Sequence, residues 1–176
     1  SISAIRSMVG QGAIEMIKKG LAESGEPQPA GNLQDALRSR FLEHYQNCFL
    51  QETRPFPSVV DTLENLRASG HPMAVCTNKS YEISMAILNG LALNKYFCGI
   101  VGGDTLTTAK PHPEPIEAAI GLTKGDKSSA IMVGDSITDV NAAHAAGIPV
   151  IAVSFGYTDI APNNLGADSV IDHFNQ

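Results

Sequence analysis

Short apolar runs, each followed by polar residues, are the feature that most constrains the fold of this chain. Four of them lie at residues 73–76, 97–101, 130–133 and 149–153, and a shorter fifth run at 167–171 suits an edge position. Runs this short that are apolar on both faces predict strands of a parallel sheet covered on both sides. Between them, apolar residues recur every three or four positions, which indicates helices. From about residue 55 onward, the sequence therefore predicts a doubly wound, parallel α/β fold.

The residues before this point show a different pattern. Ile14, Ile17 and Leu21 have helical spacing, and a segment rich in glycine and proline at 24–31 predicts a loop. Apolar residues then recur every four positions over 33–49, which predicts a long amphipathic helix whose apolar stripe joins the core. No strand is expected here. We therefore expect two parts, a helical one over residues 1–54 and an α/β one over 55–176.

Composition narrows the classes of function. With 176 residues, 43% apolar and 17% charged, the chain has enough apolar material for a packed core and is not of the disordered class. A net charge of −6 argues against nucleic acid or an anionic membrane as the main partner, and no apolar run is long enough to span a membrane. The three cysteines lack paired spacing, so we expect a reducing compartment, the cytoplasm, with Cys76 and Cys98 in the core.

The polar residues that follow the apolar runs are the candidates for function. Thr77 and Asn78 follow the first run, Lys110 lies after the second, and Asp135 and Asp139 follow the third. Ligands of open α/β sheets bind outside the carboxyl ends of the strands, where these side chains converge. Hydroxyl, amide and ammonium donors suit a phosphate. Carboxylates beside a phosphate call for a hard cation such as Mg²⁺, so the pattern predicts a small phosphorylated substrate and magnesium.

Each candidate also has a purely structural interpretation. Thr77 could cap the following helix, and Lys110 could be a solvated loop residue. Ser136 and Asp139 match a capping box with aspartate in place of the usual glutamate. Asp135 favours function most strongly, because an unpaired carboxylate at the end of an apolar strand is costly to desolvate. The five histidines stand singly, and we expect them at the surface or in caps.

Three segments resemble motifs of the haloacid dehalogenase superfamily, and within it the phosphoglycolate phosphatase group: Cys76–Lys79 (motif II), Lys110–Pro115 (motif III) and Gly134–Asp139 (motif IV). Three further segments are similar to that group: Arg6–Gly12, Ala142–Pro149 and Phe155–Tyr157. The resemblance implies a Rossmann-like core over residues 55–176 and a helical cap over 1–54. Arg6 and the turn Gly10–Gly12 could reach the site from the cap and select the substrate, and Arg6 could equally be a solvated surface residue.

The resemblance also implies a mechanism. An aspartate of motif I attacks the phosphoryl group to give an aspartyl-phosphate, and a second aspartate two positions later acts as acid and base. Thr77 would form a hydrogen bond with a phosphoryl oxygen, and Asn78 would lie beside it. Lys110 would neutralise the charge on the phosphoryl group and on the nucleophile. Asp135 would bind Mg²⁺, and Asp139 would orient the metal's waters or Lys110. Two acidic residues in motif IV favour a metal-dependent phosphatase over a dehalogenase.

Motif I itself, of the form Asp-x-Asp-Gly-Thr, does not occur in the 176 residues, and no two aspartates are separated by a single residue. In the family this motif precedes the cap and its strand is central in the sheet. We therefore expect the motif and the first strand upstream of Ser1. The 176-residue chain alone is expected to have unpaired strand edges and no turnover.

Other functions remain open beside a phosphatase for 2-phosphoglycolate. The same fold serves phosphosugar mutases and hydrolases of pyrophosphate or phosphonate, and a catalytically dead relative could be an interaction module. The presence of Thr77, Lys110, Asp135 and Asp139 argues against the last of these. Both a monomer and a homodimer are compatible with the sequence.

Overall fold

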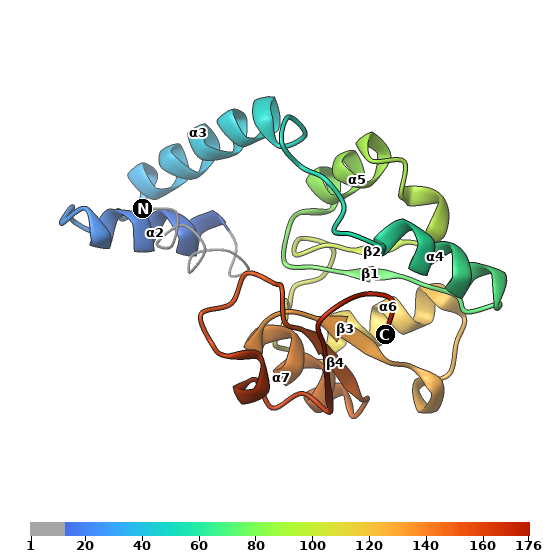
Figure 1. Cartoon of the computed structure of the whole chain (residues 1–176). Coiled ribbons are helices and arrows are strands. Elements are labelled where there is room, and N and C mark those ends of the chain that lie inside the picture. Colours follow the sequence, from blue (N-terminus) through green and yellow to red (C-terminus); the bar gives the residue numbers. More distant parts are fainter. Residues whose placement is uncertain (1–12) are drawn as a thin grey trace.

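A computed structural model describes residues 13–176 as an alternation of helices and short strands (Figure 1). The helices are α2 (Ala13–Glu23), α3 (Asn32–Cys48), α4 (Val59–Ala68), α5 (Tyr81–Gly90), α6 (Glu114–Thr123) and α7 (Ile137–Ala146). The strands are β1 (Val75–Cys76), β2 (Ile100–Val101), β3 (Met132–Gly134), β4 (Val150–Val153) and β5 (Ser169–Ile171). The predicted order of elements is confirmed, and every strand is shorter than the apolar run that predicted it.

The strands form two parallel sheets. One pairs β1 with β2, and the other has the order β3-β4-β5, which places β5 at an edge as expected. Within the described residues, β1 and β3 each pair with a strand on one side only. Because parallel strands connected through helices end at the same side of the fold, the loops after β1 and β3 lie on that side. The predicted α/β class is confirmed.

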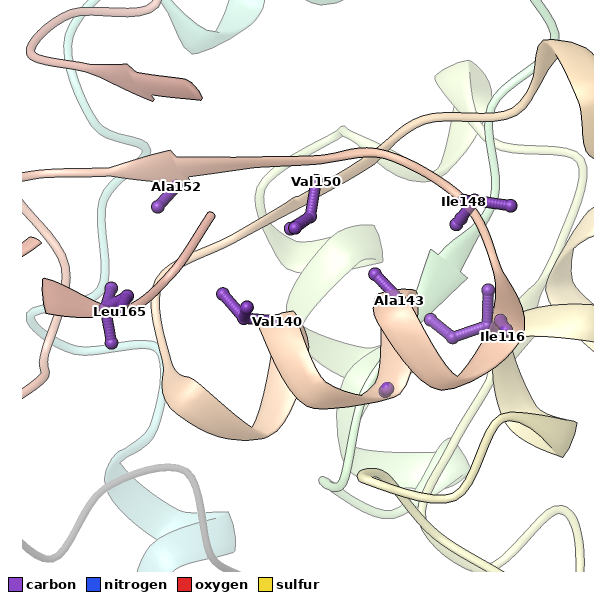
Figure 2. Close-up of a cluster of buried hydrophobic side chains, with 9 residues drawn as sticks. Ile116, Val140, Ala143, Ile148, Val150, Ala152 and Leu165 are labelled. Carbon is purple, nitrogen blue, oxygen red and sulfur yellow. The ribbon is translucent and has the colours of Figure 1, made fainter. Parts of the chain in front are cut away.

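Helix α7 and sheet β3-β4-β5 enclose the main core. Figure 2 shows Val140 and Ala143 on α7 pointing toward Val150 on β4, and all three are fully or almost fully buried. Alanine on the inner side of α7 lets the helix approach the sheet closely. The helix ends at Gly147, whose φ of 70° lies in the left-handed region that glycine adopts without strain.

One expectation about the sheet is wrong. Among the described residues, strand β3 is covered on one face only, because Val133 on the strand and Ile131 just before it remain 47% and 60% exposed while Met132 between them packs against the core. Alternate side chains point to opposite faces of a strand, so α7 and its neighbours cover the face that carries Met132. The core position expected for Cys98 is also wrong, since this residue is exposed and precedes β2; Cys76 on β1 is half-buried.

Helices α2 and α3 lie beside each other and away from the two sheets (Figure 1). Both helices and the loop between them are confirmed, but the apolar stripe of α3 does not join a core. No residue of α3 is buried, and Leu33 is 59% exposed. Arg6 and Gly10–Gly12, which were expected to approach the site, lie outside the described residues.

Candidate active site

A cavity of about 680 Å³ lies between α2, α3 and the carboxyl ends of β1 and β3. Its wall includes all five residues that the sequence singled out: Thr77, Asn78, Lys110, Asp135 and Asp139. Separate segments contribute them, as the position of each after a parallel strand predicts. The half-buried residues Phe41, Leu42 and Tyr45 of α3 line the opposite side, which explains why the stripe of α3 is neither core nor free surface.

Lys110 and Asp139 form a buried ion pair in this wall. The Lys110 Nζ donates to Asp139 Oδ1 at 2.6 Å and to the carbonyl of Cys76 at 2.7 Å. Only 7% and 10% of the two side chains are exposed, so Lys110 is not a solvated loop lysine. Burial on its own would raise the pKa of Asp139, but the Lys110 ammonium and hydrogen bonds from Lys110, Ser136 and the Asp135 amide lower it below its usual value. Asp139 is therefore a carboxylate at neutral pH, paired with an ammonium.

The second oxygen of Asp139 caps α7. Its Oδ2 accepts hydrogen bonds from the Ser136 hydroxyl at 2.8 Å and from the amides of Asp135 and Ser136 at 3.1 Å, which completes the predicted capping box. A Cβ at Gly134 would lie 2.5 Å from the Cβ of Asp139, so only glycine fits there. The structural and the functional interpretations of Asp139 are thus compatible, because each uses a different oxygen.

Asn78 joins the loop after β1 to the backbone of Lys110. Its Nδ2 donates to the Lys110 carbonyl at 2.9 Å, and the Lys110 amide donates to Asn78 Oδ1 at 3.0 Å. This double contact fixes the backbone from which the lysine side chain extends. Thr77 does not cap α5, whose N-cap is Ser80; its Oγ1 accepts the amide hydrogen of Lys79 at 3.1 Å instead. Thr77 lines the cavity, and its hydroxyl has no acceptor among residues 13–176.

Asp135 lies half-buried at the end of β3. Its Oδ2 accepts the amide hydrogen of Tyr157 at 2.8 Å, and Gly156 packs so closely against this carboxylate that a side chain there would clash. Among residues 13–176, no group of three or more acidic, histidine or cysteine side chains is placed to hold a metal ion. Mg²⁺ usually takes only one or two carboxylates together with water and substrate phosphate, so Asp135 suits it as a single ligand.

The family follows from comparison with known proteins. The model of the haloacid dehalogenase-like hydrolases matches residues 1–153. The chain belongs to this family. It is 41% identical over 170 residues to the phosphoglycolate phosphatase of Caulobacter vibrioides, a match that covers 97% of this chain and 71% of that protein.

Two further comparisons agree. The phosphoglycolate phosphatase of Agrobacterium fabrum is 42% identical over 167 residues, covering 95% of this chain and 71% of the relative. The crystal structure of a predicted phosphoglycolate phosphatase from Haemophilus somnus superposes with a TM-score of 0.90 at 27% identity, over 99% of this chain and 79% of that one. The α/β fold with its parallel sheets is therefore the fold of a haloacid dehalogenase-like hydrolase.

One contact of this hydrolase site was not predicted from the sequence. The Lys79 Nζ donates to the hydroxyl of Tyr45 at 2.9 Å and lies 4.5 Å from the centre of that ring. The ring of Tyr45 is stacked on that of Phe41, with 6.1 Å between the ring centres, and its centre lies 5.9 Å from that of the Phe49 ring. The spacing of Phe41, Tyr45 and Phe49 gave the face of the helix, but nothing local indicated which residue that face would meet.

The histidines and cysteines of this hydrolase lie outside any metal or disulfide cluster of the described residues. His44, His71, His112 and His144 are exposed, and His173 is half-buried and accepts a hydrogen bond from the amide of Asn175, as expected of surface and capping histidines. The three cysteines are free. In the described part of the chain, the helices are too short or too polar to cross a membrane.

Proposed function

We propose that this hydrolase is a Mg²⁺-dependent phosphatase acting on a small phosphomonoester, 2-phosphoglycolate. The observation that carries the proposal is the buried Lys110 ammonium, held by Asp139 and by the Cys76 carbonyl in the wall of a cavity. A fixed, desolvated cation beside hydroxyl donors suits the transfer of a phosphoryl group, which needs positioning and charge neutralisation above all. The names of the relatives from Caulobacter vibrioides and Agrobacterium fabrum support the choice of substrate.

The residues of the cavity then have distinct tasks. The Thr77 hydroxyl donates to a phosphoryl oxygen, and Lys110 neutralises charge on the phosphoryl group and the attacking carboxylate. Asn78 lies beside the phosphate and holds the backbone of Lys110 through its two hydrogen bonds. Asp139 keeps the ammonium in place while Oδ2 holds the start of α7.

Asp135 is the carboxylate that we propose for Mg²⁺. The Tyr157 amide and Gly156 fix the orientation of this carboxylate at the end of β3. Its Oδ1 accepts no hydrogen bond from the described residues and can bind a ligand. Bound magnesium would neutralise phosphate charge and orient the substrate.

We propose an aspartate nucleophile that forms an aspartyl-phosphate intermediate. The 176 residues contain no Asp-x-Asp pair, which supports our proposal of a nucleophile outside them. Turnover by the 176-residue chain alone is therefore predicted to be absent. We further propose residues 1–54 as a cap over a core of residues 55–176, in an enzyme of the cytoplasm, where its three free cysteines stay reduced.

The test uses the complete product of the gene, assayed with Mg²⁺ against 2-phosphoglycolate, phosphosugars, pyrophosphate and a phosphonate. We expect the highest kcat/KM with 2-phosphoglycolate. Lys110→Met should lower kcat by about 10²–10³-fold or more, since it removes a preorganised charge. Asp126→Asn is the matched control, because Asp126 is exposed, does not line the cavity and caps a short turn that asparagine also caps.

Several outcomes would contradict the proposal. Retention of wild-type kcat by Lys110→Met would remove Lys110 from the mechanism. A phosphosugar that is converted to its isomer, without release of phosphate, would identify a mutase. Phosphate release by the verified 176-residue chain would exclude an aspartate nucleophile outside these residues.

A further inference from the structure

We infer that Lys79, positioned by Tyr45, selects the substrate by binding a second anionic group on it, a carboxylate one carbon away from the phosphate ester oxygen. The inference rests on the proposed phosphatase function and assigns the part of the site that recognises the acid.

Among the described residues, three cationic side chains line the cavity: Arg38, Lys79 and Lys110. Their partners differ. Lys110 is neutralised by Asp139 at 2.6 Å. Lys79 forms no ion pair with any described residue, and its partner is the neutral hydroxyl and ring of Tyr45. A phenol orients an ammonium without neutralising it, so the full charge of Lys79 remains for a ligand.

The backbone of Lys79 is fixed relative to the predicted phosphate ligand. Its amide donates to Thr77 Oγ1 at 3.1 Å, and its carbonyl accepts the Gly103 amide hydrogen at 2.8 Å. Gly103 lies against Asn78 so closely that any side chain there would clash. The Cα atoms of Thr77 and Lys79 are two residues apart and so lie within about 7 Å of each other. A substrate that reaches both side chains from one loop is therefore short.

Tyr45 aims the lysine side chain from the opposite wall. It belongs to α3, whose aromatic residues Phe41 and Phe49 have ring centres 6.1 and 5.9 Å from that of Tyr45. An exposed lysine otherwise samples many rotamers, and ordering it on a ligand costs conformational entropy. The hydrogen bond to Tyr45 restricts that freedom before the substrate arrives, which favours binding.

Arg38 is the competing candidate. It also lines the cavity and forms no ion pair among the described residues. It is seven residues before Tyr45 on the same helix, which places it about 10 Å along the axis from the residue that contacts Lys79. A substrate of two or three carbons bound at Thr77 is closer to Lys79 than to Arg38, because Thr77 and Lys79 belong to the same loop after β1.

The experiment compares 2-phosphoglycolate with ethyl phosphate, which has the same chain length and no carboxylate. The complete gene product is assayed as wild type and as Lys79→Met, Lys79→Arg, Arg38→Met and Lys95→Met. Lys95 is the matched control, because its Nζ lies 4.8 Å from the ring centre of Tyr96, outside the cavity. The readout is the ratio of kcat/KM for the acidic to that for the neutral ester, with a thermal melt of every variant.

We expect Lys79→Met to lower this ratio at least tenfold, mainly through a higher KM for 2-phosphoglycolate. Lys79→Arg should recover part of the ratio, and Lys95→Met and Arg38→Met should resemble the wild type. The inference is overturned if Lys79→Met leaves the ratio unchanged, if Arg38→Met carries the loss instead, or if the wild type prefers neither ester. Absence of hydrolysis of every phosphomonoester by the wild type would overturn the proposed function itself, and the role of Lys79 with it.

Discussion

Helices α7 and α2 show how little the amphipathic pattern alone determines burial. In α2 the apolar and polar residues separate onto opposite faces far more clearly than in α7. Yet α2 buries none of its residues, whereas α7 buries five, three of them alanines that are fully inaccessible. Small residues on one side of α7 allow it to pack closely against β3, β4 and α6, whereas the stripe of α2 borders a cavity.

The two regions therefore serve different purposes. Sheet β3-β4-β5 and α7 hold Asp135 and Asp139 on a rigid, close-packed support. Helices α2 and α3 present half-buried apolar and aromatic side chains to the cavity, and the contact of Tyr45 with Lys79 links α3 to the loop after β1. We infer that the first region supplies stability and supports the two carboxylates of the site, and that α3 contributes to the choice of substrate through its contact with Lys79.

The largest effect on stability should come from breaking the buried ion pair between Lys110 and Asp139. Lys110→Met leaves Asp139 buried without its counter-ion, which should lower the free energy of unfolding by about 3–5 kcal/mol. Chemical denaturation monitored by circular dichroism measures it. The double variant Lys110→Met with Asp139→Leu should recover part of that loss, although it also removes the cap of α7. If Lys110→Met is as stable as the wild type, the ion pair does not contribute to stability in this way.

Two leucines allow the comparison to be made with the same substitution. Leu165 is 2% exposed in the core beside α7, and Leu33 is 59% exposed on α3. Leu165→Ala should lower the free energy of unfolding by about 2–5 kcal/mol, because it leaves a cavity. Leu33→Ala should change it by less than about 0.5 kcal/mol. Equal losses would mean that α3 is as tightly packed as the core, against the exposure that we find.

Acid should act on the first region through Asp139. Burial opposes its ionisation, but the Lys110 ammonium and the hydrogen bonds to the carboxylate outweigh burial and lower its pKa from the usual 3.8. A lowered pKa means a stabilising contribution that is complete above the ordinary pKa and is lost as the pH falls through the folded-state value. The melting temperature should therefore decrease below about pH 4, and Asp139→Asn should show a shallower decrease over that range.

Leu165→Ala is the control for this measurement, since it should shift the whole curve of melting temperature against pH without changing its slope at acid pH. An Asp139→Asn variant with the same acid slope as the wild type would assign the acid sensitivity to other carboxylates.

The sequence predicted what local periodicity and strand order determine. It placed Thr77, Lys110 and Asp135 after three parallel strands, and the structure brings them to one cavity. It also predicted the capping box of α7, a contact between residues only three positions apart. These features depend on neighbours in the chain or on the general rule for the carboxyl ends of strands.

Contacts between distant segments were beyond such reasoning. Asn78 and Lys110 are 32 residues apart, and Tyr45 and Lys79 are 34 apart, so no periodicity relates them. Their meeting depends on where α3 and the loop after β2 settle on the fold. The exposure of Ile131 and Val133 has the same cause, because an apolar run shows that a strand can be covered on both faces and not which neighbours cover it.

The smallest predicted effect tests the second region alone. Tyr45→Phe removes the hydroxyl that accepts the Lys79 hydrogen bond and keeps the ring on which the ammonium lies. Because Lys79 is exposed and the aromatic stack remains, the free energy of unfolding should change by less than about 0.5 kcal/mol. Preference for 2-phosphoglycolate over ethyl phosphate should fall by about threefold, which corresponds to a net hydrogen bond of roughly 0.7 kcal/mol. A loss of stability without a loss of preference would make Tyr45 a packing residue of α3, and α3 would then have no part in the selection of the substrate by Lys79.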